Sequence, residues 1–223
     1  MKKAYSFCTI TGLLLLAAAL CLTVYNIVTD MQAGESTRTV LKELAADILP
    51  NMDTEIGAGE KMQGGSAEIL PETGNSAQEI CIPDYLLNPQ MDMPQKEVDG
   101  EDYIGILQIP DLSLELPIMG EWSYKKLKIA PCRYSGSAYL DTMVIAAHNY
   151  ASHFGRLKEL SLGAEVLFTD IDGNLFSYEV AEVEILPPYA VEEMTSGEWE
   201  LTLFTCTVGG QSRVTIRCTR KRV

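Results

Sequence analysis

The pattern of apolar and polar residues divides the chain into an apolar N-terminal segment, a polar middle and a C-terminal half of short apolar runs. Residues from Phe7 to Val28 include no charged side chain and are rich in Leu and Ala, so they can cross a bilayer as a helix. Apolar residues continue past Ala17–Ala19, which favours an uncleaved signal anchor over a cleaved signal peptide. Because Lys2 and Lys3 precede the anchor, the N-terminus is predicted to be cytoplasmic and the remainder extracellular.

The middle of the chain, residues 30–99, is predicted to form a stalk. Apolar residues between Ser36 and Ile48 recur at helical spacing with charges between them, which predicts a short amphipathic helix leaving the membrane. From Pro50 to Glu68 the sequence is rich in Gly, Glu, Met and Ser without periodicity, as is typical of a flexible linker. The more apolar stretch Cys81–Pro89 is expected to lie extended across the surface of the domain that follows.

Beyond Gly100 the sequence is typical of an all-β domain, because short runs of β-branched and aromatic residues are separated by turn residues. We expect strands at Tyr103–Ile109, Leu114–Met119, Thr142–His148, Ala164–Thr169, Asn174–Leu186, Glu200–Thr207 and Arg213–Thr219. Asp172-Gly173 predicts a hairpin turn, and short helical turns are expected within 154–160 and 191–195. Strands at this spacing predict a closed β-barrel with one or two short helices.

Charge excludes one class of function. The formal net charge is −14, and residues 30–99 hold 14 Asp/Glu against 4 Lys/Arg, so the acidity is greatest in the predicted stalk. An acidic chain without a basic stripe offers no surface that attracts phosphate groups. We therefore expect no nucleic-acid partner.

Six cysteines in an exported chain raise the question of disulfides. Cys8 and Cys21 lie in the apolar anchor, which leaves Cys81, Cys132 and Cys218 as structural candidates and one further thiol for chemistry. Cys218 alternates with apolar neighbours and is expected to be a small core residue. No Cys-x-x-Cys pair or His/Cys cluster is present in the sequence, so we expect no zinc site and assign no metal or cofactor.

The candidate reactive thiol is Cys206, which ends a predicted strand and is followed seven residues later by Arg213. The chain has two histidines. His148 directly follows the apolar run Met143–Ala147, which predicts a buried strand with a polar residue at its end, whereas His153 is the second choice because it lies in a predicted loop. A thiol reacts as thiolate and a nearby cation favours that form, so Cys206, His148 and Arg213 are a candidate set for acyl chemistry. The alternative is an inert core thiol.

The residues Thr202, Leu203, Phe204, Thr205 and Cys206 resemble the signature Thr-Leu-x-Thr-Cys of the sortases, which has a histidine upstream and an arginine downstream. Sortases are membrane-anchored cysteine transpeptidases of Gram-positive bacteria. The resemblance covers roughly residues 102–222 and implies the sortase β-barrel. The sequence departs from the family pattern at Ala147, where many relatives have glycine. The short span Pro187–Glu198 does not favour class B, and no class is assigned.

The resemblance also implies a role for each residue. Cys206 would cleave a Leu-Pro-x-Thr-Gly-like sorting signal between Thr and Gly and hold the acyl group as a thioester, while His148 would transfer the protons. Arg213, rather than Arg217 on the same face of the last strand, would orient the substrate and stabilise the oxyanion. The implied partners are surface proteins that carry a C-terminal sorting signal, and an amine from a peptidoglycan precursor or a pilin lysine.

The chain also contains such a signal itself. Residues Leu70, Pro71, Glu72, Thr73 and Gly74 spell Leu-Pro-x-Thr-Gly. They lack the apolar span and basic tail of a wall-sorting signal, so they do not mark the chain as an ordinary sorted protein. The segment is a candidate self-substrate or pseudosubstrate, and the alternative is coincidence in a linker where Pro and Gly are common.

The predicted organisation has three parts: residues 1–29 as a cytoplasmic stub and transmembrane anchor, residues 30–99 as an acidic stalk, and residues 100–223 as a sortase catalytic domain. We therefore expect a single-pass membrane protein with its catalytic domain outside the cell. Two other functions remain open. A cysteine endopeptidase that hydrolyses its thioester would use the same residues, and a non-catalytic, membrane-anchored scaffold of the cell wall would need no reactive thiol.

Overall fold

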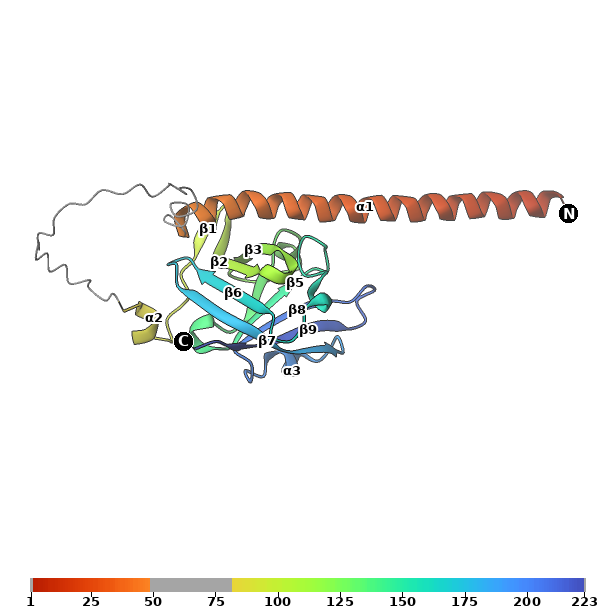
Figure 1. The fold of residues 1–223 in the computed structure, drawn as a ribbon. Helices are drawn as coiled ribbons and strands as arrows, with labels where there is room; N and C mark the ends of the chain where they lie inside the picture. The colour runs from red at the N-terminus through yellow and green to blue at the C-terminus, as the bar shows by residue number, and fades with distance from the viewer. Residues whose placement is uncertain (1, 49–81, 223) are drawn as a thin grey trace, which may run out of the picture.

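The first element of the structure, a computed structural model that describes residues 2–48 and 82–222, is one uninterrupted helix, α1 (Lys2–Ile48) (Figure 1). Among the described residues, α1 is the one helix long and apolar enough to cross a membrane. The apolar side chains described before Thr29 are largely exposed. The anchor and the amphipathic helix expected after it are continuous, because no proline interrupts the sequence between them.

The C-terminal half of α1 packs along the barrel, whereas its N-terminal half extends beyond it (Figure 1). The buried side chains of this half are each 8% exposed or less, and they are Ala33, Thr37, Val40, Leu44 and Ile48. Spacings of three or four residues place them on one face of the helix. Burying a side chain such as Val40, Leu44 or Ile48 contributes about 1.5–3 kcal/mol, so this part of α1 is held firmly against the barrel.

Nine strands of the described chain form one sheet: β1 (Lys96–Val98), β2 (Glu101–Ile109), β3 (Leu114–Met119), β4 (Cys132–Ser135), β5 (Met143–Ala147), β6 (Glu165–Asp170), β7 (Leu175–Leu186), β8 (Leu201–Cys206) and β9 (Arg213–Arg220). Their order is β1-β2-β3-β4-β5-β8-β9-β7-β6, and β6 pairs back onto β2. Strands β2 to β9 therefore close an eight-stranded barrel, and β1 forms a hairpin with β2. The predicted all-β closed barrel is confirmed.

Barrel closure depends on a glycine in β2. Gly105 has φ +154°, and a Cβ at this position would lie 2.1 Å from the carbonyl oxygen of Thr169 and 2.9 Å from Cα of Asp170 on β6. A side chain would force the two strands apart, so only glycine allows the backbones to approach this closely.

Two apolar cores stabilise the domain, one inside the barrel and one between the barrel and α1. Side chains along β8 point alternately into these two cores. Leu201 and Leu203 lie in the inner core, whereas Phe204 lies in the outer core together with Leu44 of α1. Cys218 is a buried member of the inner core with a free thiol, as predicted. The outer face of β8 is thus partly covered, and this is the face from which Cys206 projects.

The remaining helical elements are short. They are α2 (Asp84–Leu87), α3 (Val191–Thr195) and the 3-10 turns η2 (Pro110–Leu112), η3 (Lys126–Lys128), η4 (Ala138–Leu140) and η5 (Leu157–Glu159). The helix expected within 191–195 is confirmed, and the one expected within 154–160 is a single 3-10 turn. The hairpin predicted at Asp172-Gly173 joins β6 to β7.

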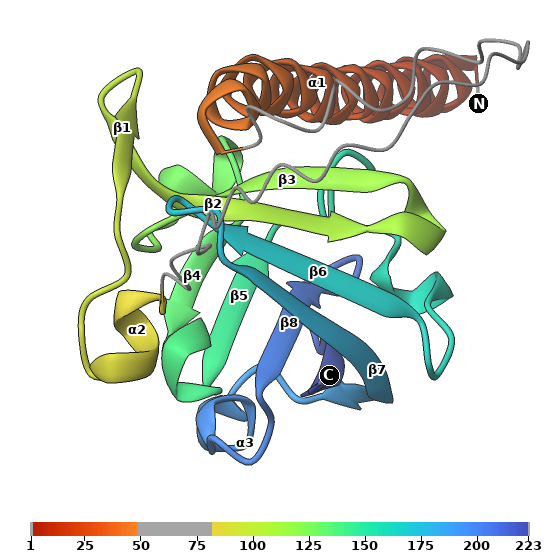
Figure 2. The same cartoon turned by 60° about the vertical axis from the view of Figure 1, so that its left-hand side comes forward.

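The prediction that residues 81–89 lie extended is wrong for the described part of this segment. Pro83 precedes a single helical turn, α2, near one end of the barrel (Figure 2). The turn directs Tyr85 onto the barrel, where its ring stacks on Tyr139 with centroids 4.8 Å apart and lies 5.3 Å from Phe176. Pro83 is the N-cap residue of this turn, and the aromatic contacts of Tyr85 favour the turn over an extended path.

Candidate active site

The register of three strands brings the predicted site residues to one end of the barrel. β5 and β8 are parallel and pair Ala147 with Thr205, so the next residues, His148 and Cys206, are neighbours. β8 and β9 are antiparallel and pair Cys206 with Arg213. Because adjacent strands lie about 4.8 Å apart, the backbones of His148, Cys206 and Arg213 lie side by side on three neighbouring strands.

All three side chains lie on the outer face of the barrel. Ala146 and Phe204, two residues before His148 and Cys206 on their strands, belong to the outer core, and strand alternation repeats every two residues. His148, Cys206 and Arg213 are each partly exposed. A substrate can therefore reach them from outside without entering the barrel.

The threonines of the signature are structural. The Thr205 hydroxyl is buried and donates a 2.8 Å hydrogen bond to the carbonyl oxygen of Ala147, which fixes the end of β8 against the end of β5. The Thr202 hydroxyl accepts a 3.0 Å hydrogen bond from Arg217. Leu203, between them, packs inside the barrel. These contacts give a physical reason for each residue type in the motif.

His148 has a half-buried ring next to Tyr150, with the two ring centroids 5.0 Å apart. Burial, with a smaller effect from the positive charge of Lys128, lowers the pKa of His148 below its ordinary value of 6.5. The imidazole is therefore predominantly neutral at pH 7. No hydrogen bond joins it to Cys206 in the described structure, so strand register alone sets their proximity.

Arg213 is held by the β8–β9 loop. Its Nη1 donates to the carbonyl oxygens of Gly210 at 3.0 Å and Ser212 at 3.1 Å. The loop is closed by Thr207, whose backbone N–H donates to Ser212 at 2.9 Å. Both of these hydrogen bonds use Nη1. The other guanidinium nitrogens of Arg213, Nε and Nη2, have no hydrogen-bond partner among the described residues.

Residues 107–221 match the sortase domain family. The chain belongs to the sortase family.

Similar solved structures include sortase C from Clostridium perfringens SM101, with 22% identity over 63% of this chain and 76% of that chain and a TM-score of 0.48. Sortase D5 transpeptidase from Clostridium perfringens has 19% identity over 57% and 83%, with a TM-score of 0.49. Sortase C1 from Streptococcus agalactiae has 21% identity over 54% and 68%, with a TM-score of 0.47. No curated protein matches the sequence.

Sortases are cysteine transpeptidases, so the family assignment makes this chain an enzyme at that level. The described cysteines differ in accessibility. Burial raises the pKa of Cys132 and of Cys218 to about 12, which keeps both thiols protonated and inert. Cys206 is partly exposed at a strand end. It is therefore the described thiol of the sortase domain best placed to meet a substrate.

The second-choice residues have structural environments. Arg217 is 3% exposed, and its guanidinium bonds Glu184, Thr202 and the carbonyl oxygens of Glu193 and Met194. His153 is fully buried, its Nε2 lies 3.4 Å from the Thr37 hydroxyl, and burial lowers its pKa to about 4. Neither side chain is accessible to a substrate.

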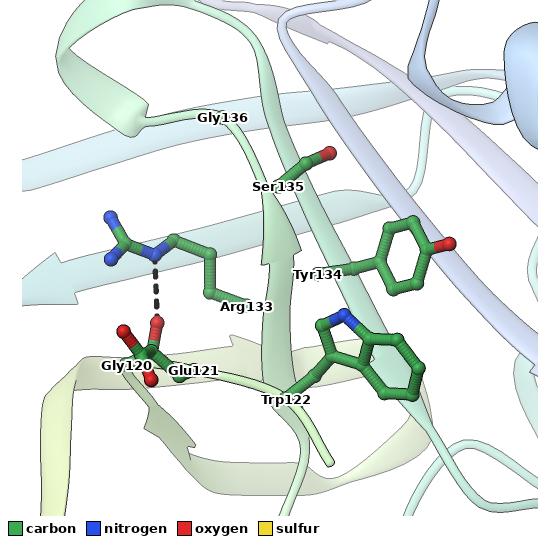
Figure 3. Close-up of a pocket in the computed structure, with 7 residues that line it drawn as sticks. All are labelled: Gly120, Glu121, Trp122, Arg133, Tyr134, Ser135 and Gly136. Carbon is green, nitrogen blue, oxygen red and sulfur yellow. Dashed lines mark hydrogen bonds between the residues drawn. The ribbon is translucent and has the colours of Figure 1, made fainter.

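An aromatic row beside the site was not predicted from the sequence. The Trp122 and Tyr134 rings lie 5.2 Å apart, and Tyr134 lies edge-on to Phe204 at 5.3 Å. Trp122 and Tyr134 also line a pocket of about 430 Å³ that Figure 3 shows, with Arg133 on the other side of β4. Trp122 comes from a loop and Tyr134 from β4, a strand that the sequence pattern did not indicate, so no periodic signal marked these two residues.

Among the described residues, no group of three or more His, Cys, Asp or Glu side chains could hold a metal ion. The Leu70–Gly74 segment and Cys81 lie outside the described residues.

Proposed function

We propose that this sortase is a membrane-anchored transpeptidase in which Cys206 is the nucleophile, His148 the general acid and base, and Arg213 the oxyanion and substrate contact. The observation that supports this most is the strand register, which places the ends of β5 and β8 and the start of β9 side by side. The apolar half of α1 would lie in the membrane with the N-terminus inside the cell and the barrel outside.

The proposed reaction has two acyl transfers. Neutral His148 takes the Cys206 proton as the sulfur attacks the carbonyl carbon of the Thr-Gly bond in a Leu-Pro-x-Thr-Gly-like signal. The carbon–nitrogen bond then breaks, the leaving amine receives that proton from His148, and a thioester remains on Cys206. An incoming amine, from a peptidoglycan precursor or a pilin lysine, attacks the thioester, gives a proton to His148 and releases the thiolate, which regains that proton.

Arg213 would act on the charge that develops during each attack. Its Nη1 is used by the loop carbonyls, which orients the guanidinium and leaves Nε and Nη2 available. A preorganised donor aimed at a developing oxyanion contributes several kcal/mol to catalysis.

The test is a transfer reaction with the full-length protein in detergent, a peptide containing Leu-Pro-Glu-Thr-Gly and a primary amine, with products identified by mass spectrometry. We expect an amide product in the wild type and a loss of about 10³-fold or more in Cys206→Ala. Cys132→Ala is the matched control and should retain transfer. A hydrolysed product whose amount does not change with amine concentration would instead support a cysteine endopeptidase. Full activity in Cys206→Ala would exclude both the transpeptidase and the endopeptidase.

A further inference from the structure

The loop that follows β5, residues 148–155, is held from outside the barrel by α1. The Asp30 carboxylate accepts hydrogen bonds from the backbone N–H of Ala151 at 3.1 Å and of Ser152 at 3.2 Å. The Ser152 hydroxyl donates to the same carboxylate at 2.6 Å and lies 3.3 Å from the Asp30 carbonyl oxygen. One acidic side chain thus satisfies two loop amides and one hydroxyl, and bonds to an ionised acceptor are stronger than neutral ones.

A second contact lies further along the same helix. A Cβ at Gly34 would be 3.2 Å from Cβ of Ser152, so glycine allows the helix to approach the loop closely. The Thr37 hydroxyl lies 3.4 Å from Nε2 of His153. Thr37 is 4% exposed and His153 is fully buried. The helix and the loop therefore share a packed interface.

The internal hydrogen bonds of the loop connect this interface to His148. The backbone N–H of Phe154 donates to the carbonyl oxygen of His148 at 3.2 Å, and that of His153 donates to Tyr150 at 3.0 Å. The Tyr150 ring is a neighbour of both histidine rings, with centroid distances of 5.0 Å to His148 and 5.5 Å to His153. A change in loop position would therefore move the backbone and the ring neighbour of His148.

We propose that Asp30 of α1 is a positioning residue for His148, so that the membrane helix forms part of the active-site architecture. This inference rests on the proposed role of His148 as general acid and base. Asp30 acts through the Ala151-Ser152 backbone and has no contact with Cys206 or Arg213. Small displacements of a catalytic group lower the rate of chemistry more than they lower substrate affinity, because affinity depends on other contacts.

The first test uses the full-length protein in detergent or nanodiscs and the peptide transfer assay. We expect Asp30→Ala to lower kcat by about tenfold while KM changes less than about twofold. Glu35→Ala is the matched control, because it removes an exposed acidic side chain five residues further along α1, and it should leave both constants unchanged. Asp30→Asn keeps an oxygen acceptor and should recover part of the loss.

The second test needs no substrate. The rate of Cys206 alkylation by iodoacetamide is followed against pH by peptide mass spectrometry, since this rate reports the thiolate that His148 influences. We expect Asp30→Ala to shift the midpoint of this profile and Glu35→Ala to keep the wild-type midpoint. Ser152→Ala removes the hydroxyl contacts alone and should shift the midpoint less. If Asp30→Ala does not fold, Ser152→Ala takes its place in this test.

The outcomes separate this inference from the proposed function. Wild-type kcat and alkylation profiles in both Asp30→Ala and Ser152→Ala would overturn the positioning role even if His148→Ala abolishes transfer. Full transfer activity in His148→Ala would instead overturn the proposed role of the histidine and, with it, the reason to position it.

Discussion

The Thr205 hydroxyl joins the two strands whose ends carry the thiol and the imidazole. The carbonyl oxygen that accepts its 2.8 Å hydrogen bond belongs to the peptide group between Ala147 and His148. We expect Thr205→Val to lower the free energy of unfolding by about 1–3 kcal/mol, because a buried acceptor loses its donor, and to reduce the transfer rate. Urea unfolding and the peptide assay measure the two effects. Thr219→Val on β9 is the control, because no described hydrogen bond involves this hydroxyl, and it should lower stability and transfer rate by less. Equal losses in the two variants would contradict the proposed role of the Thr205 hydroxyl.

His153 predicts a dependence of stability on pH. Burial, with a smaller effect from His148, lowers the folded-state pKa of His153 to about 4, whereas the ordinary value is 6.5. Between these values the unfolded chain binds the additional proton, so the contribution to stability is complete above about pH 6.5 and is lost as pH falls through about 4. A difference of this size corresponds to about 3 kcal/mol.

The variant His153→Leu should therefore flatten the pH dependence of unfolding over that window. Urea unfolding of the full-length protein at pH 7 and pH 5 measures the slope. An unchanged slope in His153→Leu would show that other groups control acid stability.

At the scale of elements, Arg217 fixes α3 against the outside of the barrel at the start of β8, four residues before Cys206. Its guanidinium bonds Glu184 of β7 at 2.7 Å, Thr202 of β8 at 3.0 Å, and two carbonyl oxygens at α3. Lysine cannot reproduce this planar fork. We expect Arg217→Lys to destabilise the protein by about 2–4 kcal/mol in urea unfolding, because buried partners lose their donors. Arg213→Lys, on the same face of β9 but more exposed, should cost much less stability while reducing transfer.

The sequence predicted the strands that carry a strong apolar pattern and missed those that do not. β5 and β8 consist almost entirely of buried residues, so their positions were predicted within one residue. β4 has one fully buried residue, Cys132, and a register shift between Arg133 and Ser135, so no period of two marked it. Strand formation there depends on pairing with β5, which is a long-range effect.

The candidate site could be predicted only in part, because the sequence shows local patterns and does not show which strands pair. The sequence indicated Cys206, His148 and Arg213 through the signature and the ends of apolar runs, but only the parallel pairing of β5 with β8 shows why they meet. The periodicity of Ser36–Ile48 predicted an amphipathic helix and gave no information about its partner. The contact between Asp30 and Ser152 joins residues more than a hundred positions apart, so no local pattern could indicate it.

At the scale of the whole molecule, the Leu70–Gly74 motif lies between α1 and the barrel in the sequence. If Cys206 accepts this signal, its thiol displaces the Gly74 amine and holds residues 1–73 as a thioester, which water or an added amine then cleaves. Purified wild-type protein with such an amine should therefore separate into residues 1–73 and a fragment that begins at Gly74, and Cys206→Ala should not. Intact-mass spectrometry of the incubated full-length protein measures this. Thr73→Ala should prevent the cleavage, while an intact wild-type chain and unaltered transfer in Thr73→Ala would assign the motif no role.

The contact of Asp30 with the loop after β5 also sets a height above the membrane. Asp30 lies two residues beyond Val28, which is about 3 Å along a helix. In the proposed orientation, the residues next to His148 therefore lie at the level of the lipid headgroups. A protein whose scissile bond is a few residues from its own membrane segment would meet Cys206 directly, whereas an extended spacer of ten residues would carry the bond about 33 Å away. The anchor helix would thus select substrates by the distance of their scissile bond from the bilayer.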